Sequence, residues 1–239
     1  MNWLDLGLSS PGENLALDEA LLDRCEEGAG GEVLRFWEAA QHFVVLGYAN
    51  AVNREVNTEF CRVRGIPILR RCSGGGTVLQ GPGCLNYTLI LRVDRACELR
   101  SVHGTNDYVL NRHADALSKL LGKPVAREGH TDLALDGLKF SGNAQRRRKN
   151  ALLFHGSFLL NLDLDLLEEA LPLPSKQPDY RLNRSHRDFL TILRLPAASL
   201  KHGLREAWSA TEPMRDVPTQ QLAALVRDKY GRAEWNLKF

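Results

Sequence analysis

Residues 132–145, with the sequence DLALDGLKFSGNAQ, indicate most about the fold, because they read as a β-hairpin. Two largely apolar arms, residues 132–135 and an arm that begins at Leu138, flank Asp136-Gly137, a favoured two-residue hairpin turn. The tripeptide Ser141-Gly142-Asn143 is unusual in a plain strand and predicts a bulge or a close approach of another part of the backbone. The sequence therefore predicts a sheet around the middle of the chain.

Further strands and helices are predicted on both sides of this hairpin. Runs of β-forming residues bounded by turns predict strands at residues 33–37, 43–46, 66–69, 87–91 and 151–160. Helical spacing of apolar residues predicts a first helix with Asn14 as its N-cap and a second helix, at residues 106–121, that ends at Gly122. Later residues read as mainly helical, around 164–171, 199–210 and 220–230. We expect one α+β domain over residues 1–239, with a mixed, largely antiparallel sheet flanked by helices.

The composition is that of an ordinary globular protein and argues against several other classes. The chain has 239 residues and a formal net charge of +2, and no apolar run is long enough to span a membrane. Its first residues lack the pattern of a signal peptide, and its five cysteines form no CxxC pair of the kind found in zinc sites. We expect a cytoplasmic protein that binds neither nucleic acid nor a membrane.

The most unusual stretch is RRCSGGGTV at residues 70–78, directly after a predicted strand. Three glycines let the backbone turn tightly and bring its N–H groups close to an anion. Arg70 and Arg71 beside them have the hydrogen-bond donors that pair with a phosphate or a carboxylate. The spacing is neither that of a Walker loop nor GxGxxG. The alternative is an ordinary glycine-rich turn with solvated arginines.

Four further polar residues lie in or beside predicted strands, and each has two readings. Lys139 either reaches the surface or points into a polar pocket, and Asp132 is either a magnesium ligand or a hydrogen-bonded turn residue. His155 and Asn86 are either hydrogen-bonded core residues or members of a site. The basic run at residues 146–149 is either a solvated turn or a docking surface for an acidic partner.

Taken together, these segments resemble the lipoate–protein ligase A family, within the biotin/lipoate protein ligase superfamily that also includes octanoyltransferases. The resemblance rests on RRCSGGGTV, Leu85-Asn86-Tyr87, DLALDGLKFSGNAQ and Phe154-His155-Gly156, in that order, and it spans most of the chain. It implies the fold of the superfamily's catalytic domain. It also implies ATP-dependent attachment of lipoate or octanoate, through an acyl-adenylate, to a lysine of a lipoyl-domain protein of the dehydrogenase E2 or glycine-cleavage H type.

The resemblance also implies roles for individual residues. Lys139 would be the central catalytic cation, in contact with carboxyl and phosphate oxygens, and Asp132 would help to hold Mg²⁺. The residues expected to bind the nucleotide and the acyl group are Arg70, Ser73, Gly74, Gly75, Gly76, Thr77, Val78, Asn86, Lys139 and His155. An apolar tunnel for the acyl chain is expected to be lined by Val45, Leu69, Val78 and Phe140.

Two departures from the family pattern bear on the reaction. Two-domain ligases carry a C-terminal accessory domain that this chain is too short to contain, so either a separate subunit supplies that function or the protein performs less than the whole reaction. Single-domain relatives transfer octanoyl groups from acyl carrier protein through a cysteine shortly before the lysine-bearing segment. Residues 125–131 of this chain contain no cysteine, so we favour the ligase. A transferase that needs no ATP is the first alternative, and a non-catalytic module that binds acyl ligands or lipoyl domains is the second.

Overall fold

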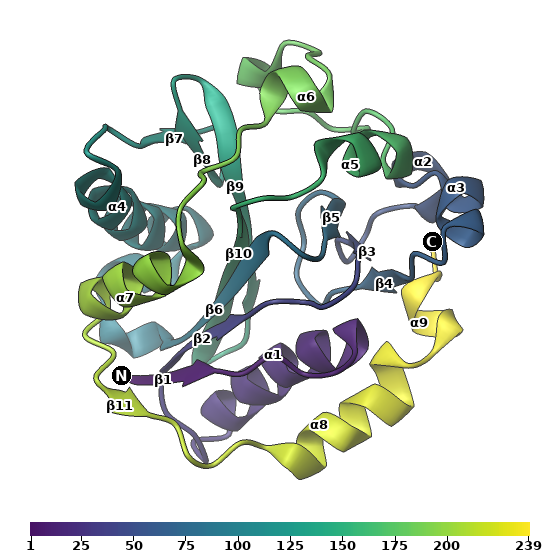
Figure 1. Ribbon diagram of the computed structural model, residues 1–239. Coiled ribbons are helices and arrows are strands. Elements are labelled where there is room, and N and C mark those ends of the chain that lie inside the picture. Colours follow the sequence, from purple (N-terminus) through teal and green to yellow (C-terminus); the bar gives the residue numbers. More distant parts are fainter.

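The computed structural model describes residues 1–239 and consists of two sheets enclosed by helices (Figure 1). The large sheet has, in spatial order, the strands β11 (Glu212–Pro213), β1 (Asn2–Asp5), β2 (Val33–Trp37), β6 (Cys84–Arg92), β10 (Ala151–Leu159), β9 (Leu138–Arg147), β8 (Asp132–Leu135) and β7 (Ala126–Glu128). The small sheet has the strands β4 (Ile68–Arg70), β3 (Phe43–Leu46) and β5 (Val78–Gln80). The pairs β11–β1, β1–β2 and β3–β4 are parallel, and all others are antiparallel. The expected α+β class with a mixed, largely antiparallel sheet is confirmed.

The helices surround these sheets on several sides. They are α1 (Pro11–Glu26), α2 (Val52–Glu55), α3 (Thr58–Val63), α4 (Val102–Leu121), α5 (Leu164–Ala170), α6 (His186–Phe189), α7 (Ala197–Ala207), α8 (Thr219–Leu225) and α9 (Ala233–Asn236). Short 3₁₀ turns lie at Val93–Arg95, Cys97–Arg100 and Asp179–Arg181, and a π-helical turn at Val226–Tyr230 continues α8. None of the helices combines the length and the apolar character that crossing a membrane requires.

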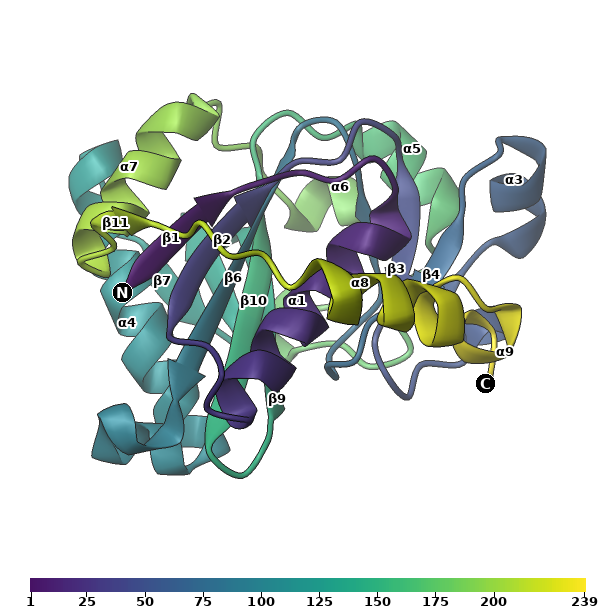
Figure 2. The same cartoon turned by 90° about the horizontal axis from the view of Figure 1, so that it is seen from below.

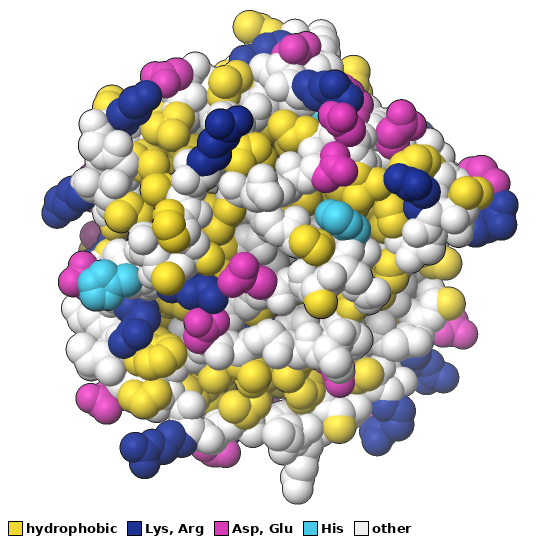
Figure 3. All heavy atoms as spheres, in the orientation of Figure 1, with side chains coloured by type: hydrophobic (Ala, Val, Ile, Leu, Met, Phe, Trp, Pro, Cys, Tyr) yellow, Lys and Arg dark blue, Asp and Glu magenta, His cyan; other side chains and the backbone are white.

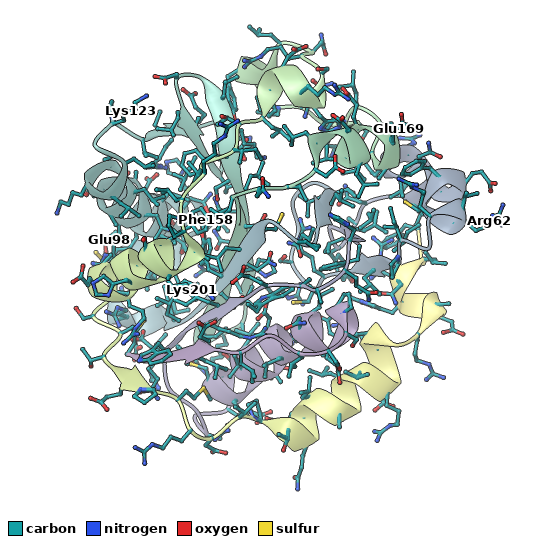
Figure 4. All side chains as sticks on the ribbon, viewed as in Figure 1. Arg62, Glu98, Lys123, Phe158, Glu169 and Lys201 are labelled. Carbon is teal, nitrogen blue, oxygen red and sulfur yellow. The ribbon has the colours of Figure 1, made fainter.

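The two central strands of the large sheet are buried on both faces, which explains their nearly continuous apolar sequences. On one face, Leu89 of β6 and Phe154 of β10 belong to a core of 22 buried residues that includes side chains of α4 and α7. On the other face, Ile90 and Leu153 pack with α1, and Leu222 of α8 lies against this second cluster. Figure 2 shows α1 and α8 side by side across the sheet, and Figure 4 shows Phe158 in the interior near α7. On the face seen in Figure 3, basic and acidic side chains are interspersed among apolar ones.

The predicted hairpin is present as β8 and β9, and its turn has the expected chemistry. Asp136 and Gly137 have φ values of 51° and 76°, the positive values that a type I′ turn requires. The register shifts between Leu133, which pairs with Ser141, and Ala134, which pairs with Lys139. This irregularity leaves Phe140 as an extra residue, directly before the tripeptide at which a bulge was predicted and next to Lys139.

The start of the first helix differs from our expectation. Ser10, and not Asn14, is the N-cap, and a capping box joins Ser10 to Glu13. Asn14 lies inside the helix, where its amide bonds to the carbonyl of Leu8 and accepts from Arg35. The Asn14 side chain therefore accepts a hydrogen bond from Arg35 and does not cap the helix. The second predicted helix begins earlier than expected, at Val102, and ends as predicted at a left-handed Gly122.

Candidate active site

A cavity of about 760 Å³ lies where the glycine-rich loop, the large sheet and residues 174–190 meet. Its walls come from α1, from the ends of β2 and β3, from β5 and β6, and from the hairpin strands β8, β9 and β10. Cavities of this size, with a few convergent polar groups, are typical of small-molecule sites. Of the expected site residues, Gly75, Gly76, Thr77, Val78, Asn86, Asp132, Lys139 and His155 line it.

The carbonyls of the glycine-rich loop at residues 73–77 accept hydrogen bonds, whereas its amides have no backbone partners. The carbonyl of Ser73 accepts from the amide of Tyr48, and the carbonyls of Gly74 and Gly76 accept from the guanidinium of Arg71. The amides of residues 73–77 donate no hydrogen bond to the rest of the backbone. Gly75 has a φ of 85°, which a residue with a side chain rarely adopts. A turn with free, adjacent amides is suited to binding an anion.

The two arginines before this loop have different positions, and Arg70 is not where we expected it. Arg70 lies outside the cavity lining, and its buried guanidinium donates to the backbone carbonyls of Gly47, Tyr48, Asn50 and Trp235. Arg71 lines the cavity. Burial lowers the pKa of Arg71 to about 10, so this side chain stays charged at neutral pH. Ser73 and Gly74 also lie outside the lining; the Ser73 side chain is fully buried, and the carbonyl of Gly74 accepts from Arg71.

Lys139 faces the cavity and forms an ion pair with Asp132. Its Nζ atom lies 2.8 Å from Asp132 Oδ1, while Tyr180 donates its hydroxyl to Asp132 Oδ2 at 2.8 Å. Burial and the Asp132 carboxylate raise the pKa of the Tyr180 hydroxyl well above its ordinary value, so it stays protonated and remains a donor. A Cβ atom at Gly142 would lie 2.8 Å from Lys139 Nζ, so glycine at this position leaves the room that the lysine needs. The sequence predicted a close approach of backbone at this tripeptide, whereas the neighbours of Gly142 are side-chain atoms.

His155 and Asn86 also face the cavity, with contrasting hydrogen bonding. His155 Nε2 lies 2.6 Å from Ser73 Oγ, and Nδ1 lies 3.6 Å from the Asp18 carboxylate. Neither the amide nitrogen nor the amide oxygen of Asn86 has a hydrogen-bond partner, although both are buried. Buried polar atoms usually have partners, so the Asn86 amide has unused capacity for a ligand in the cavity.

The apolar part of the cavity wall agrees only in part with the expected tunnel. Val45 and Val78 line the cavity, together with Leu15 and Trp37. Phe140 points to the opposite side of β9, where it belongs to the main core, and Leu69 packs beside the cluster that contains Trp37 without reaching the cavity. Alternation along a strand sends neighbours to opposite faces, which explains why Phe140 and Lys139 separate.

Several cavity residues were not predicted. Tyr87 donates to Asn143 Oδ1 at 2.6 Å, and the Asn143 amide donates to the carbonyl of Thr131 at 2.7 Å, which fixes the wall between β6 and β9. Asn143 belonged to the segment singled out in the sequence, whereas Asp18 is inconspicuous within a helix. Residues 174–190, which contribute ten lining residues including Lys176, have no periodic pattern that would have placed them at a site.

The basic run at residues 146–149 is largely used within the protein. Arg147 donates to the carbonyl of Leu99 at 2.6 Å, and Arg148 donates to Asp23 at 2.8 Å. The guanidinium of Arg146 lies 5.9 Å from the ring centroid of Tyr48. Three of the four basic side chains therefore have intramolecular partners, which fits neither a fully solvated turn nor a free docking surface.

The five cysteines are free thiols, and none of them lines the cavity. Burial raises the pKa of both Cys72 and Cys84 to about 12, so these thiols stay protonated at neutral pH. Cys25 and Cys61 are also buried, and Cys97 lies on the surface. No group of three or more histidine, cysteine, aspartate or glutamate side chains is arranged to hold a metal ion by itself.

Comparisons with known proteins point to one family. Residues 10–209 match the family model described as the lipoyl protein ligase A/B catalytic domain. The octanoyltransferase LipM of Brevibacillus brevis is 28% identical to the chain over 96% of this chain and 95% of the relative. A bipartite lipoate protein ligase from Thermoplasma acidophilum, described with its E2 lipoyl domain, has a similar structure with a TM-score of 0.84, 22% identity and coverage of 99% and 95%. A lipoate-protein ligase A bound with ATP gives a TM-score of 0.83, 24% identity and coverage of 99% for both chains.

Proposed function

Because the chain belongs to the lipoyl protein ligase A/B catalytic domain family, we propose that it is an ATP-dependent lipoate–protein ligase. Family membership makes it an enzyme of the lipoate ligase or octanoyltransferase type. In the proposed reaction, the carboxylate of lipoate or octanoate attacks the α-phosphorus of ATP, and pyrophosphate leaves. A lysine amine of a lipoyl-domain protein then attacks the acyl carbon, loses a proton as the amide forms, and AMP leaves. All of residues 1–239 act as one catalytic domain.

The observation that carries this proposal is the combination of free amides and cations in one cavity. The amides of residues 73–77 have no backbone partner, and Lys139 lines the same cavity. Formation of an acyl-adenylate concentrates negative charge on the α-phosphate and on the departing pyrophosphate. Donors that are fixed in advance stabilise such charge without reorganising at the moment of reaction. A transfer from a thioester to an amine develops a single negative charge at the acyl oxygen, which is much less charge than a triphosphate brings into the cavity.

Lys139 is the residue to which we assign the catalytic role. Its ammonium lies 2.8 Å from Asp132 and is one-quarter exposed, so it is held by a carboxylate and still accessible from the cavity. In this position it would contact both the acyl carboxylate and the α-phosphate and bring the two reacting groups together. Asn86, with its unpartnered amide, would donate to an oxygen of the same ligands.

Magnesium would be held by Asp132. The ion usually binds one or two carboxylates and takes its other ligands from phosphates and water, so the single carboxylate beside Lys139 fits a site that the nucleotide completes. When bound, the ion neutralises phosphate charge. Asp132 is already oriented toward the cavity by the hydroxyl of Tyr180.

In this proposal the two arginines beside the loop hold backbone carbonyls and do not contact the nucleotide themselves. Arg71 holds the carbonyls of Gly74 and Gly76, which leaves the loop amides for the phosphates. Arg70 holds the chain at Gly47 to Asn50 from a position outside the cavity, so we assign it no direct nucleotide contact. The acyl chain would extend along Leu15, Trp37, Val45 and Val78.

The positions of the cysteines favour the ligase over a cysteine-dependent transferase. A thioester mechanism needs an accessible thiol of low pKa near the acyl group. Cys72 and Cys84, which flank the glycine-rich loop in sequence, are buried, and burial raises the pKa of each to about 12. Octanoyl transfer without ATP is the second candidate, and it is favoured by the similarity to the LipM octanoyltransferase over nearly the full length of both chains.

The partners that we propose follow from the same family. The bipartite ligase of Thermoplasma acidophilum is described with an E2 lipoyl domain, so we propose a lipoyl-domain protein of the dehydrogenase E2 or glycine-cleavage H type as the acceptor. We also propose that a separate accessory subunit accelerates the reaction without being required for it, because that ligase is bipartite.

The direct test is release of pyrophosphate by the purified protein with ATP, magnesium and either lipoate or octanoate. We expect release that depends on the acid and falls at least about a hundredfold in Lys139→Ala, because the variant loses a fixed cation at the reacting phosphate. Lys123→Ala is the matched control, since Lys123 is exposed and points outward in Figure 4. Normal release by Lys139→Ala would refute the assigned role. Acylation of a lipoyl domain from octanoyl carrier protein without ATP would favour the transferase instead.

A further inference from the structure

A chain of polar side chains connects α1 to the glycine-rich loop through the centre of the molecule. Asp18 of α1 faces His155 Nδ1 of β10 at 3.6 Å, and His155 Nε2 lies 2.6 Å from the hydroxyl oxygen of Ser73. The same hydroxyl oxygen accepts a hydrogen bond of 3.0 Å from Arg71 Nε. Asp18 is itself held by a buried ion pair with Arg35. Every member of this series is buried or nearly so.

The protonation states of Asp18 and His155 determine which atom donates each hydrogen bond in the series. Burial alone would raise the pKa of Asp18, but the Arg35 guanidinium and the neighbouring His155 hold it below its ordinary value, so the carboxylate is ionised. Burial lowers the pKa of His155, so its ring is neutral at pH 7. A neutral imidazole has one N–H, and the carboxylate beside Nδ1 favours the proton on that atom. Nε2 is then an acceptor, and Ser73 donates its hydroxyl to it.

Serine, histidine and aspartate in this order resemble a nucleophilic triad, but burial argues against that reading. Ser73 has no exposed surface and does not line the cavity. An acyl carbon therefore has no route to its hydroxyl oxygen. The serine instead has a second contact that a nucleophile does not need, with Arg71.

Arg71 connects this series of side chains to the backbone of the glycine-rich loop. Its Nε atom is shared between Ser73 Oγ at 3.0 Å and the Gly74 carbonyl at 3.1 Å, and its Nη2 atom donates to the carbonyl oxygens of Gly74 at 2.6 Å and Gly76 at 2.7 Å. Both carbonyls thus face the arginine, and the amides of the loop are left without backbone partners. A rotation of the guanidinium would release both carbonyls together, because one planar group donates to both of them.

We propose that Asp18 and His155 are positioning residues that, through Ser73, hold Arg71 in the one orientation that keeps the glycine-rich loop ready for an anionic phosphate. The proposal rests on the proposed function of the loop as a phosphate site. Although His155 lines the cavity, we assign its effect on phosphate binding to the contacts through the serine hydroxyl and the guanidinium. Asp18 fixes the tautomer on which this arrangement depends.

The first test reads the histidine itself and needs neither ATP nor activity. Nitrogen chemical shifts of the His155 ring in the unliganded protein at pH 8 report which nitrogen carries the proton. We expect the Nδ1–H tautomer, together with an Arg71 Nε–H resonance that is protected from exchange with water. In Ser73→Ala that protection should decrease, because only the Gly74 carbonyl then remains as an acceptor for this N–H. A ring protonated at Nε2, or unchanged protection in Ser73→Ala, would overturn the proposal.

The second test reads the consequence for phosphate binding. Loss of a hydrogen bond to a charged group corresponds to roughly a tenfold change or more, so we expect Ser73→Ala and His155→Leu to raise the KM for ATP about tenfold with a smaller change in kcat. His155→Gln, whose amide oxygen replaces the Nε2 acceptor, should recover part of this loss. An unchanged KM for ATP in Ser73→Ala would contradict the proposal.

His113→Gln separates a positioning role from a general loss of stability. His113 is also a fully buried histidine, but its Nε2 accepts from Trp208 in the main core and it does not line the cavity. We expect this variant to be less stable with an unaltered KM for ATP. An equal rise of KM in His113→Gln would mean that the effect is structural and would overturn the proposal. A wild-type protein that does not use ATP would refute the proposed function alone, since the tautomer is measured without nucleotide.

Discussion

At the scale of single residues, the surroundings of Lys139 show that a site depends on more than the side chain to which we assign the chemistry. A register shift between β8 and β9 lies beside it, Tyr180 holds the Asp132 carboxylate with which it pairs, and Gly142 leaves space for its ammonium. The lysine and the glycine were recognisable in the sequence because they sit in one unusual segment. Tyr180 was not, since it comes from a distant part of the chain without a motif.

Gly142→Ala tests whether the space around Lys139 matters. The new Cβ atom would lie 2.8 Å from Lys139 Nζ, so the flexible end of the lysine has to move away from the reacting groups. We expect the rate of acyl-adenylate formation to fall at least about tenfold, since small displacements of reacting groups are costly. The free energy of unfolding should change by less than about 1 kcal/mol.

The control for this substitution is Gly203→Ala in α7, where a Cβ atom would meet nothing within 4 Å. Because alanine favours a helix more than glycine does, this variant should be more stable by about 1 kcal/mol, with the same activity as the wild type. Chemical denaturation and pyrophosphate release measure the two quantities. A fully active Gly142→Ala protein would show that the position of Lys139 is less constrained than its surroundings indicate.

At the scale of elements, the sequence pattern predicted the features that depend on neighbouring residues, such as strand bounds and the hairpin turn. The strands at Val33–Trp37 and Phe43–Leu46 have the predicted bounds, and the hairpin turn follows from the conformational preferences of Asp136-Gly137. The small sheet was not predictable, because β3 pairs with β4 and β5 through contacts that no local pattern encodes. The same holds for the placement of residues 174–190 over the cavity.

Arg70 shows the same limit within the site. A pair of arginines beside a glycine-rich loop looks equivalent in the sequence, but strand alternation turns the two side chains in different directions. Arg70 is used by the carbonyls of Gly47, Tyr48 and Asn50, while Arg71 reaches the loop. Which of the two faces a ligand depends on the neighbouring strand and not on the motif.

The capping box of α1 gives a prediction at this scale. Ser10 accepts from the amide of Glu13, and Glu13 accepts from the amide of Ser10, so two otherwise unpaired donors are satisfied. Ser10→Ala should lower the free energy of unfolding by about 1 kcal/mol, measured by chemical denaturation. Ser9→Ala is the control, because the exposed Ser9 hydroxyl contacts Glu13 without capping the helix, and it should cost less than about 0.5 kcal/mol. Equal losses would mean that the cap contributes nothing specific.

At the scale of the whole molecule, burial of titratable side chains links the stability of the fold to pH. His113 lies in the core between Tyr87, Phe158 and Trp208, and burial, with the nearby Arg112, lowers its pKa to about 3. Burial also lowers the pKa of His155. Both rings are therefore neutral in the folded protein under conditions in which an unfolded chain begins to bind protons.

The sign of the pH effect follows from this difference. Between the ordinary histidine pKa of 6.5 and the folded value of about 3, the unfolded state binds a proton at His113 that the folded state does not. Stability is therefore complete above pH 6.5 and is lost as the pH falls, by up to about 1.4 kcal/mol for each unit from this one group.

Comparison of variants isolates the contribution of His113. In His113→Gln, the free energy of unfolding should decline less steeply between pH 6.5 and pH 5 than in the wild type, as measured by denaturant titrations at each pH. His202→Gln, at an exposed position of α7, should keep the wild-type slope. An unchanged slope in His113→Gln would show that this ring does not remain neutral in the fold.

The central claim, that the acyl group passes through an adenylate and not through a thiol, is tested most directly by intact-mass spectrometry. The protein is mixed with a lipoyl-domain acceptor and either ATP, magnesium and octanoate, or octanoyl carrier protein alone. We predict that the acceptor gains an octanoyl group only in the first mixture, and that the protein itself carries no covalent acyl group in either. Acylation of the acceptor in the second mixture, with an octanoyl adduct on one of the five cysteines, would contradict the account.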